Sequence, residues 1–206
     1  MNLPTQLTVL RIILTPLFLF FIFYDGIIFK IIALIVYIIA SITDHYDGYY
    51  ARKLGAVSKL GRYLDPLADK ILVSSALVAF NILGFIQLWI VIIIVFRDFL
   101  ITGLRSYALF KNQQIVTTYI AKVKTTVQMV SVFIIFAILI FKHLAIESGI
   151  GLSAILFLER IHFVNILMFM VAALTVYTGI HYFVKNSTQV KSIFKDCYQA
   201  IRPSDS

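Results

Sequence analysis

The sequence has a single cysteine in 206 residues, Cys197, and only 14% of its residues are charged. One cysteine excludes a disulfide within the chain and any metal site built from several cysteines. His143 and His162 have no partner residue at metal-ligand spacing, so we expect surface roles for both. Internal repeats and low-complexity segments are also lacking, and the length is compatible with one domain.

The scarcity of charge accompanies a hydrophobic content of 61%, which excludes an ordinary soluble protein. A membrane-spanning helix needs about 20 apolar residues. We expect six such spans at approximately Leu7–Tyr24, Ile27–Ile42, Leu64–Phe85, Leu88–Phe110, Val123–Phe141 and Val164–Phe183. The sequence thus predicts an all-α integral membrane protein with six transmembrane helices. A short interfacial helix is expected before the first span, and a short amphipathic helix near Ile150–Arg160.

The basic residues are distributed unevenly around these spans. If the N-terminus is cytoplasmic, 15 of the 18 lysines and arginines fall on the cytoplasmic side or at its interface. Since lysine and arginine favour that side, we expect a multi-pass protein of the cell membrane (plasma or inner membrane) with both termini in the cytoplasm. Residues 1–185 would form the membrane domain and residues 186–206 a basic tail. The same bias explains the net charge of +8, and no recognition motif supports nucleic-acid binding.

Four of the ten acidic residues lie within one stretch of 26 residues. Asp44 and Asp47 are three apart, and Asp65 and Asp69 are four apart, so on helices each pair shares a face. Two facing pairs would form an all-oxygen pocket that suits Mg²⁺ or Mn²⁺ together with substrate phosphates. A charge within a bilayer costs about 2.5–3.5 kcal/mol, so four carboxylates at one membrane edge call for a cation. The alternative is that they are helix caps and surface charges.

The same stretch resembles the motif of the CDP-alcohol phosphotransferases, membrane enzymes of phospholipid synthesis. The motif is D-x-x-D-G-x-x-A-R-x8-G-x-x-x-D-x-x-x-D, and its fixed positions are all present: Asp44, Asp47, Gly48, Ala51, Arg52, Gly61, Asp65 and Asp69. The resemblance implies transfer of a phosphatidyl group from CDP-diacylglycerol to an alcohol, with release of CMP. It also implies that the four aspartates hold one or two divalent ions, and that Asp69 serves as the general base.

Further contacts and partners follow from this resemblance. CDP-diacylglycerol is expected to contact Thr8, Gly48, Ala51, Arg52, Ser58 and Gly61. The resemblance also implies a homodimer.

The fourth expected span carries Arg97, Asp98 and Arg105. The two arginines are eight residues apart, about 80° around a helix, so both can lean toward one cavity. An intramembrane ion pair would account for Asp98 and one arginine, and the second arginine favours an anionic ligand.

Two further motifs, R-D-F-x-x-x-x-L-R and K-x-K-T-x-x-Q, resemble the branch of the family that uses sn-glycerol 3-phosphate. The resemblance implies that Arg97, Arg105 and Lys124 hold the phosphate of this acceptor, giving phosphatidylglycerophosphate. Inositol phosphate is an alternative acceptor. A cation transporter with intramembrane carboxylates is an alternative of another class.

The distribution of basic residues leads to a test of topology. Cysteines introduced at Ser58 and Gln113, in a Cys197→Ser background, should react with an impermeant thiol reagent only from the cytoplasmic side. A cysteine at Ser148 should react from the outside. Labelling at position 58 from the outside would contradict the predicted orientation.

Overall fold

The computed structural model describes residues 3–54, 59–110, 119–187 and 189–190; side chains are described for residues 9–43, 67–108, 119–187 and 189–190. The described chain is helical apart from short turns. Its seven helices are α1 (Leu3–Phe23), α2 (Ile27–Leu54), α3 (Lys59–Ile82), α4 (Leu88–Phe110), α5 (Tyr119–Ser148), α6 (Leu152–Arg160) and α7 (Phe163–Lys185).

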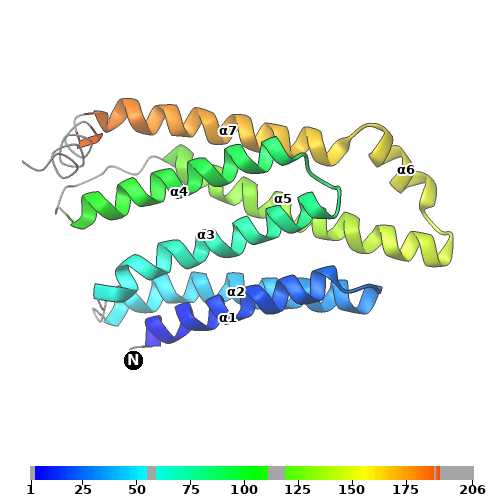
Figure 1. Ribbon diagram of the computed structural model, residues 1–206, viewed down its shortest axis with the longest axis horizontal. Helices are drawn as coiled ribbons and strands as arrows, with labels where there is room; N and C mark the ends of the chain where they lie inside the picture. Colours follow the sequence, from blue (N-terminus) through cyan, green and yellow to red (C-terminus); the bar gives the residue numbers. More distant parts are fainter. Residues whose placement is uncertain (1–2, 55–58, 111–118, 188, 191–206) are drawn as a thin grey trace, which may run out of the picture.

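The helices form one elongated bundle (Figure 1). α1 and α2 pack side by side, and α3 lies between this pair and a second group made of α4, α5 and α7. The start of α1, the end of α2, the start of α3 and the end of α7 lie at one end of the bundle. The short α6 lies at the opposite end.

Each of the six expected spans corresponds to a long helix, and α6 confirms the expected short helix near residue 150. The N-terminal interfacial helix was predicted wrongly as a separate element, because residues 3–23 form one continuous helix. Pro4 lies in the first turn, where its missing N–H leaves no hydrogen bond unmade. The helix also continues through Pro16.

An aromatic cluster joins the two halves of the bundle. The Phe136 ring of α5 lies 6.0 Å from Phe18 of α1, 5.5 Å from Tyr37 of α2 and 5.0 Å from Phe80 of α3, measured between ring centroids. All four side chains are fully buried. Edge-to-face and tilted contacts of this kind add about 0.5–1.5 kcal/mol per pair beyond the burial of area. The cluster therefore holds four helices in one arrangement.

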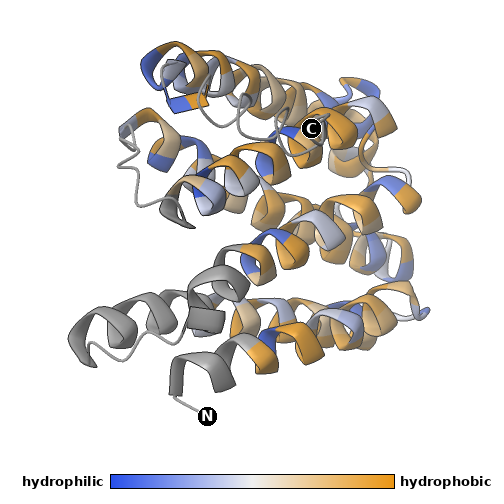
Figure 2. Ribbon diagram, turned by 60° about the vertical axis from the view of Figure 1, so that its left-hand side comes forward, coloured by the Kyte–Doolittle hydropathy of each residue, from blue (hydrophilic) through white to orange (hydrophobic). Residues whose placement is uncertain are grey.

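The outer surface of the bundle is also apolar. Ile13, Ile28 and Phe96 are exposed by 60%, 68% and 66%, and hydrophobic residues cover much of each described helix (Figure 2). Soluble monomers rarely expose contiguous apolar patches of more than a few hundred Å². Two helices, α5 and α7, are long and apolar enough to cross a bilayer.

The turn between α1 and α2 is closed by a buried lysine. Gly26 adopts a φ of 108°, a conformation that glycine reaches without strain. The Lys30 ammonium donates to the carbonyl oxygens of Ile22 and Tyr24 at 2.6 and 3.0 Å. It thereby satisfies carbonyls that the end of α1 leaves without helical partners.

Candidate active site

The predicted aspartates lie on two consecutive helices that contact each other. Asp44 and Asp47 belong to α2, and Asp65 and Asp69 to α3. Both segments are helical, which is the condition on which the argument from spacing depends. The predicted site residues outside the described side chains are Thr8, Asp44, Asp47, Gly48, Ala51, Arg52, Ser58, Gly61 and Asp65. Among the described side chains, no three His, Cys, Asp or Glu residues gather where they would hold a metal ion. The metal site therefore stays a prediction.

Asp69 is the one aspartate of the four with a described side chain. It is 25% exposed and accepts a hydrogen bond from the Lys70 ammonium at 2.9 Å. Its charge acts on the phenol of Tyr37, so the carboxylate lies toward α2. The hydroxyls of Tyr37 and Ser41 are shielded from solvent, and the side chain of Ser41 interacts with that of Tyr37. Asp69 thus lies near polar groups inside an otherwise apolar bundle.

A buried arginine reaches this region from α1. Arg11 is fully buried, and its Nε donates to the carbonyl oxygen of Ala40 on α2 at 3.4 Å. Ala40 precedes Asp44 by four residues, which is about one helical turn. α1 therefore brings a positive charge close to the part of α2 that carries the first aspartate pair.

A second polar group joins α4, α5 and α7. Asp98 of α4 accepts hydrogen bonds from the Lys124 ammonium of α5 at 2.5 Å to Oδ1 and 2.6 Å to Oδ2. The neighbouring Arg97 donates from Nη1 to Asp98 Oδ1 at 3.2 Å, and from Nη2 to Thr178 Oγ1 of α7 at 2.9 Å. Lys124 also donates to Gln128 Oε1 at 2.5 Å. We call these five residues the cationic cluster.

The charges of the cationic cluster do not cancel. Two cations, Arg97 and Lys124, share one carboxylate, so one positive charge remains. Lys124 makes three hydrogen bonds, and an ammonium group has three donors. In this arrangement Lys124 contributes charge but no further donor. The surplus charge favours an anion close to Arg97.

The structure brings two of the three predicted acceptor-binding residues, Arg97 and Lys124, into contact with one carboxylate. Arg105, two turns further along α4, is exposed. The ion pair of Asp98 with one arginine, which was the alternative interpretation, is present with the adjacent Arg97, and Lys124 is a second partner. The ion pair and the surplus cation therefore occur together.

The cationic cluster lies close to the aspartate region. Lys70, the partner of Asp69, is near enough to Lys124 for their charges to interact. A carboxylate from α3 and cations from α4 and α5 thus belong to one region of the bundle.

The contribution of α7 was not predicted from the sequence. Thr178 accepts from Arg97 and donates to the carbonyl oxygen of Thr175 at 2.9 Å. Gly179 presents only backbone to Arg97, since a Cβ at this position would lie 3.5 Å from Arg97 Cγ. The signal available was the recurrence of Thr175, Thr178 and Tyr182 on one face of an apolar helix.

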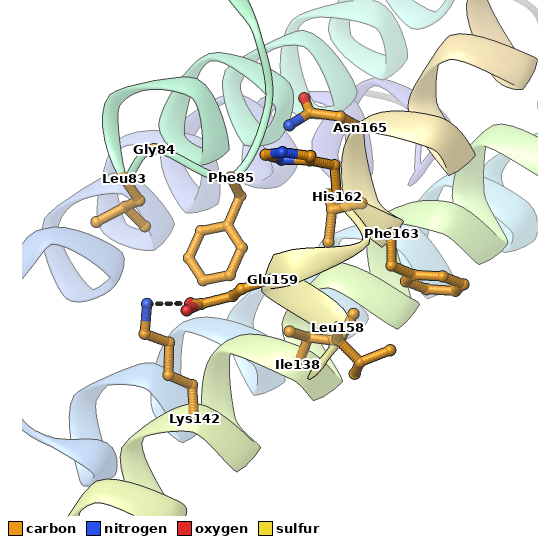
Figure 3. A pocket seen from close by; sticks show the side chains of 11 residues that line it. Leu83, Gly84, Phe85, Ile138, Lys142, Leu158, Glu159, His162, Phe163 and Asn165 are labelled. Carbon is orange, nitrogen blue, oxygen red and sulfur yellow. Dashed lines mark hydrogen bonds and ion pairs between the residues drawn. The ribbon is translucent and has the colours of Figure 1, made fainter. Parts of the chain in front are cut away.

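A cavity of about 200 Å³ lies at the opposite end of the bundle (Figure 3). Lys142 of α5 and Glu159 of α6 face each other there, with the ammonium 2.6 Å from the carboxylate. His162 and Asn165 lie on its other side. The two charges neutralise each other, and none of the predicted site residues lines the cavity. It is therefore a poor candidate for the active site.

Comparison with known proteins agrees with this geometry. Residues 1–177 match the family described as CDP-alcohol phosphatidyltransferase. The chain belongs to this family. As a CDP-alcohol phosphatidyltransferase it is an enzyme of phospholipid biosynthesis, and the alternative of a cation transporter is not supported. The matched segment includes the four aspartates and most of the cationic cluster, and it ends just before Thr178.

Several relatives of this phosphatidyltransferase carry a more specific name. The CDP-diacylglycerol–glycerol-3-phosphate 3-phosphatidyltransferase of Bacillus subtilis is 33% identical over 203 residues, 93% of this chain and 98% of the relative. The enzyme of the same name from Rickettsia bellii is 30% identical over 182 residues, 88% of this chain and 93% of the relative. A probable phosphatidylglycerophosphate synthase of Mycobacterium tuberculosis is 36% identical over 134 residues, 64% of each chain.

The shared carboxylate makes a testable prediction about stability. Asp98→Asn leaves the buried Lys124 and the half-buried Arg97 without a counter-charge, which should lower the free energy of unfolding by about 3–5 kcal/mol. Adding Lys124→Gln removes one of the two stranded charges and should restore much of the loss. Unfolding in detergent measures both effects.

Glu147→Gln, at an exposed position of α5, is the matched control and should change little. A loss below about 1 kcal/mol in Asp98→Asn, within the range of an exposed ion pair, would mean that Asp98 does not balance the buried cations.

Proposed function

We propose that this enzyme transfers the phosphatidyl group of CDP-diacylglycerol to sn-glycerol 3-phosphate, giving phosphatidylglycerophosphate and CMP. The observation that carries the proposal is the surplus positive charge of the cationic cluster, with Arg105 two turns away on the same helix. A phosphate-bearing acceptor would balance that charge, whereas a neutral alcohol would leave it uncompensated. The names of the relatives support the same choice of substrates.

The four aspartates would act on the donor substrate, CDP-diacylglycerol. Asp44, Asp47, Asp65 and Asp69 offer only carboxylate oxygens, a donor set that suits one or two Mg²⁺ or Mn²⁺ ions. Such ions supply neutralisation of the donor diphosphate and of the departing CMP. The helical geometry of α2 and α3 supports the pairing of these carboxylates.

The protein groups then have separate tasks in the reaction. Asp69 would accept the proton of the acceptor hydroxyl as its oxygen forms a bond to the phosphatidyl phosphorus. The bond from that phosphorus to the CMP oxygen breaks, and CMP leaves with the bonding electrons. Since phosphoryl transfer depends mainly on positioning and on electrostatic stabilisation, the task of Arg97 and Arg105 is to orient the acceptor.

The proposal places α1–α5 and α7 across the cell membrane, with the aspartates at the cytoplasmic edge. The apolar outer surface supports this placement. α1 begins, α2 meets α3 and α7 ends at the same end of the bundle, as six crossings require (Figure 1). α6 would then lie at the outer surface.

The acceptor can be identified by the release of CMP from CDP-diacylglycerol in mixed micelles. Wild-type enzyme should release CMP with sn-glycerol 3-phosphate, and not with glycerol or serine. Arg105→Ala should raise the apparent KM for sn-glycerol 3-phosphate by about tenfold, because a hydrogen bond to a charged group is worth about 1.5–3 kcal/mol. The matched control is Arg160→Ala, an exposed arginine at the opposite end of the bundle.

Release of CMP with inositol phosphate alone would change the identity of the acceptor but keep the proposed site for a phosphate. Release only with an uncharged alcohol would overturn the proposal.

The proposed role of the four aspartates predicts that turnover strictly requires a divalent ion. A chelator should abolish turnover, and Mg²⁺ or Mn²⁺ should restore it. Asp44→Asn should behave like chelation, because it removes a charged oxygen ligand. Asp69→Asn should instead lower kcat by about 10²–10⁴, the usual contribution of a general base, while donor binding is largely kept. Full turnover in the presence of chelator would contradict the four-carboxylate site.

A further inference from the structure

Two hydrogen-bond donors at the contact between α4 and α7 have no partner within the part of the chain that the structure describes. They are Arg97 Nε and the hydroxyl of Tyr182; both are shielded from solvent, and neither has a hydrogen-bond acceptor among the described residues. Buried polar groups are nearly always hydrogen-bonded, so an unpaired one requires an explanation. Lys124 donates three hydrogen bonds and so uses all three of its N–H groups. Arg97 donates one hydrogen bond from each of its terminal nitrogens.

The position of Tyr182 relates it to both arginines of α4. α4 and α7 run in the same direction, and Thr178 contacts Arg97 (Figure 1). Tyr182 lies four residues beyond Thr178, about 6 Å along the axis, and Arg105 lies eight residues beyond Arg97, about 12 Å. Tyr182 is thus level with the midpoint between the two arginines. The charges of both arginines act on its phenol.

At Gly179 the backbone of α7, and not a side chain, lies beside the Nε of Arg97. A Cβ at this position would lie 3.6 Å from Arg97 Nε and 3.5 Å from Arg97 Cγ, both ordinary van der Waals distances. Gly179 and Tyr182 are three residues apart, so they share a face of α7. One face of α7 therefore places the phenol of Tyr182 and the bare backbone of Gly179 beside Arg97 Nε.

Packing alone does not account for the hydroxyl of Tyr182. Its ring contacts Phe183 edge to face, with 6.1 Å between the ring centroids, and a phenylalanine would make the same contact. The side chain is 8% exposed. A buried tyrosine hydroxyl usually finds a partner, and leaving it unpaired is unfavourable.

We propose that Tyr182 contacts the acceptor, with its hydroxyl donating a hydrogen bond to a phosphate oxygen that also accepts from Arg97 Nε. α7 then forms one wall of the acceptor site and selects for a phosphate monoester. This inference rests on the proposed function in one respect, namely that the acceptor carries a phosphate. Thr178 and Gly179 act through Arg97 and are positioning residues.

Tyr182→Phe tests the contact in the full-length enzyme. CMP release should show an apparent KM for sn-glycerol 3-phosphate that is raised about 10- to 100-fold, as for a lost hydrogen bond to a charged group. The midpoint of thermal unfolding should be unchanged or higher, because the substitution removes a buried hydroxyl that has no protein partner. Tyr177→Phe, at an exposed position of the same helix, is the matched control and should alter neither quantity.

Gly179→Ala supplies a second, independent variant. Its methyl group fits at ordinary contact distances, so the unfolding midpoint should be kept. The methyl group would occupy the space beside Arg97 Nε, and the KM for sn-glycerol 3-phosphate should rise while the KM for CDP-diacylglycerol stays the same.

The possible outcomes separate this inference from the proposed function. Wild-type enzyme that works with sn-glycerol 3-phosphate, together with an unchanged KM in Tyr182→Phe, overturns the contact and leaves the proposed function in place. A lower unfolding midpoint with an unchanged KM assigns Tyr182 to packing and also overturns it. Wild-type enzyme that accepts only an uncharged alcohol overturns both.

Discussion

The carboxylate of Asp98 is the group on which the cationic cluster depends. It accepts hydrogen bonds from Arg97 and Lys124, which are otherwise held in an apolar bundle. Without it, the positive charges of the half-buried Arg97 and the buried Lys124 would repel each other, and the link between α4 and α5 through Asp98 would be lost. With it, Arg97 is directed toward Thr178 on α7. One carboxylate thus sets the contacts among three helices and leaves a surplus of one positive charge.

The arrangement places opposite charges near each other without letting them cancel. The aspartates belong to α2 and α3, and the cations of the cationic cluster to α4 and α5. Strong direct pairing between the two sets would occupy the groups that the proposed phosphate acceptor and the proposed divalent ion need. Asp98 supplies a local partner for the cations, and Lys70 pairs with Asp69. The aromatic cluster around Phe136 holds the two halves of the bundle at this separation.

Much of this architecture was predictable because its signals are local. The apolar runs predicted the positions of six long helices, since the length of a span follows from the thickness of a bilayer. The N-terminal helix was misjudged because the polarity of its first residues suggested a boundary. Helix continuation depends on the backbone, and Pro4 in the first turn does not interrupt it.

The sequence by itself determined the family, through eight residues at constant offsets between Asp44 and Asp69, and it determined the helical periodicity that pairs the aspartates. Only the tertiary structure decided which groups Asp98 neutralises, that Lys124 has no donor left, and that α7 contributes to the site. The hydrogen bonds concerned join residues 26 and 81 positions apart. No local pattern encodes such contacts, because they depend on how three separate helices pack against one another.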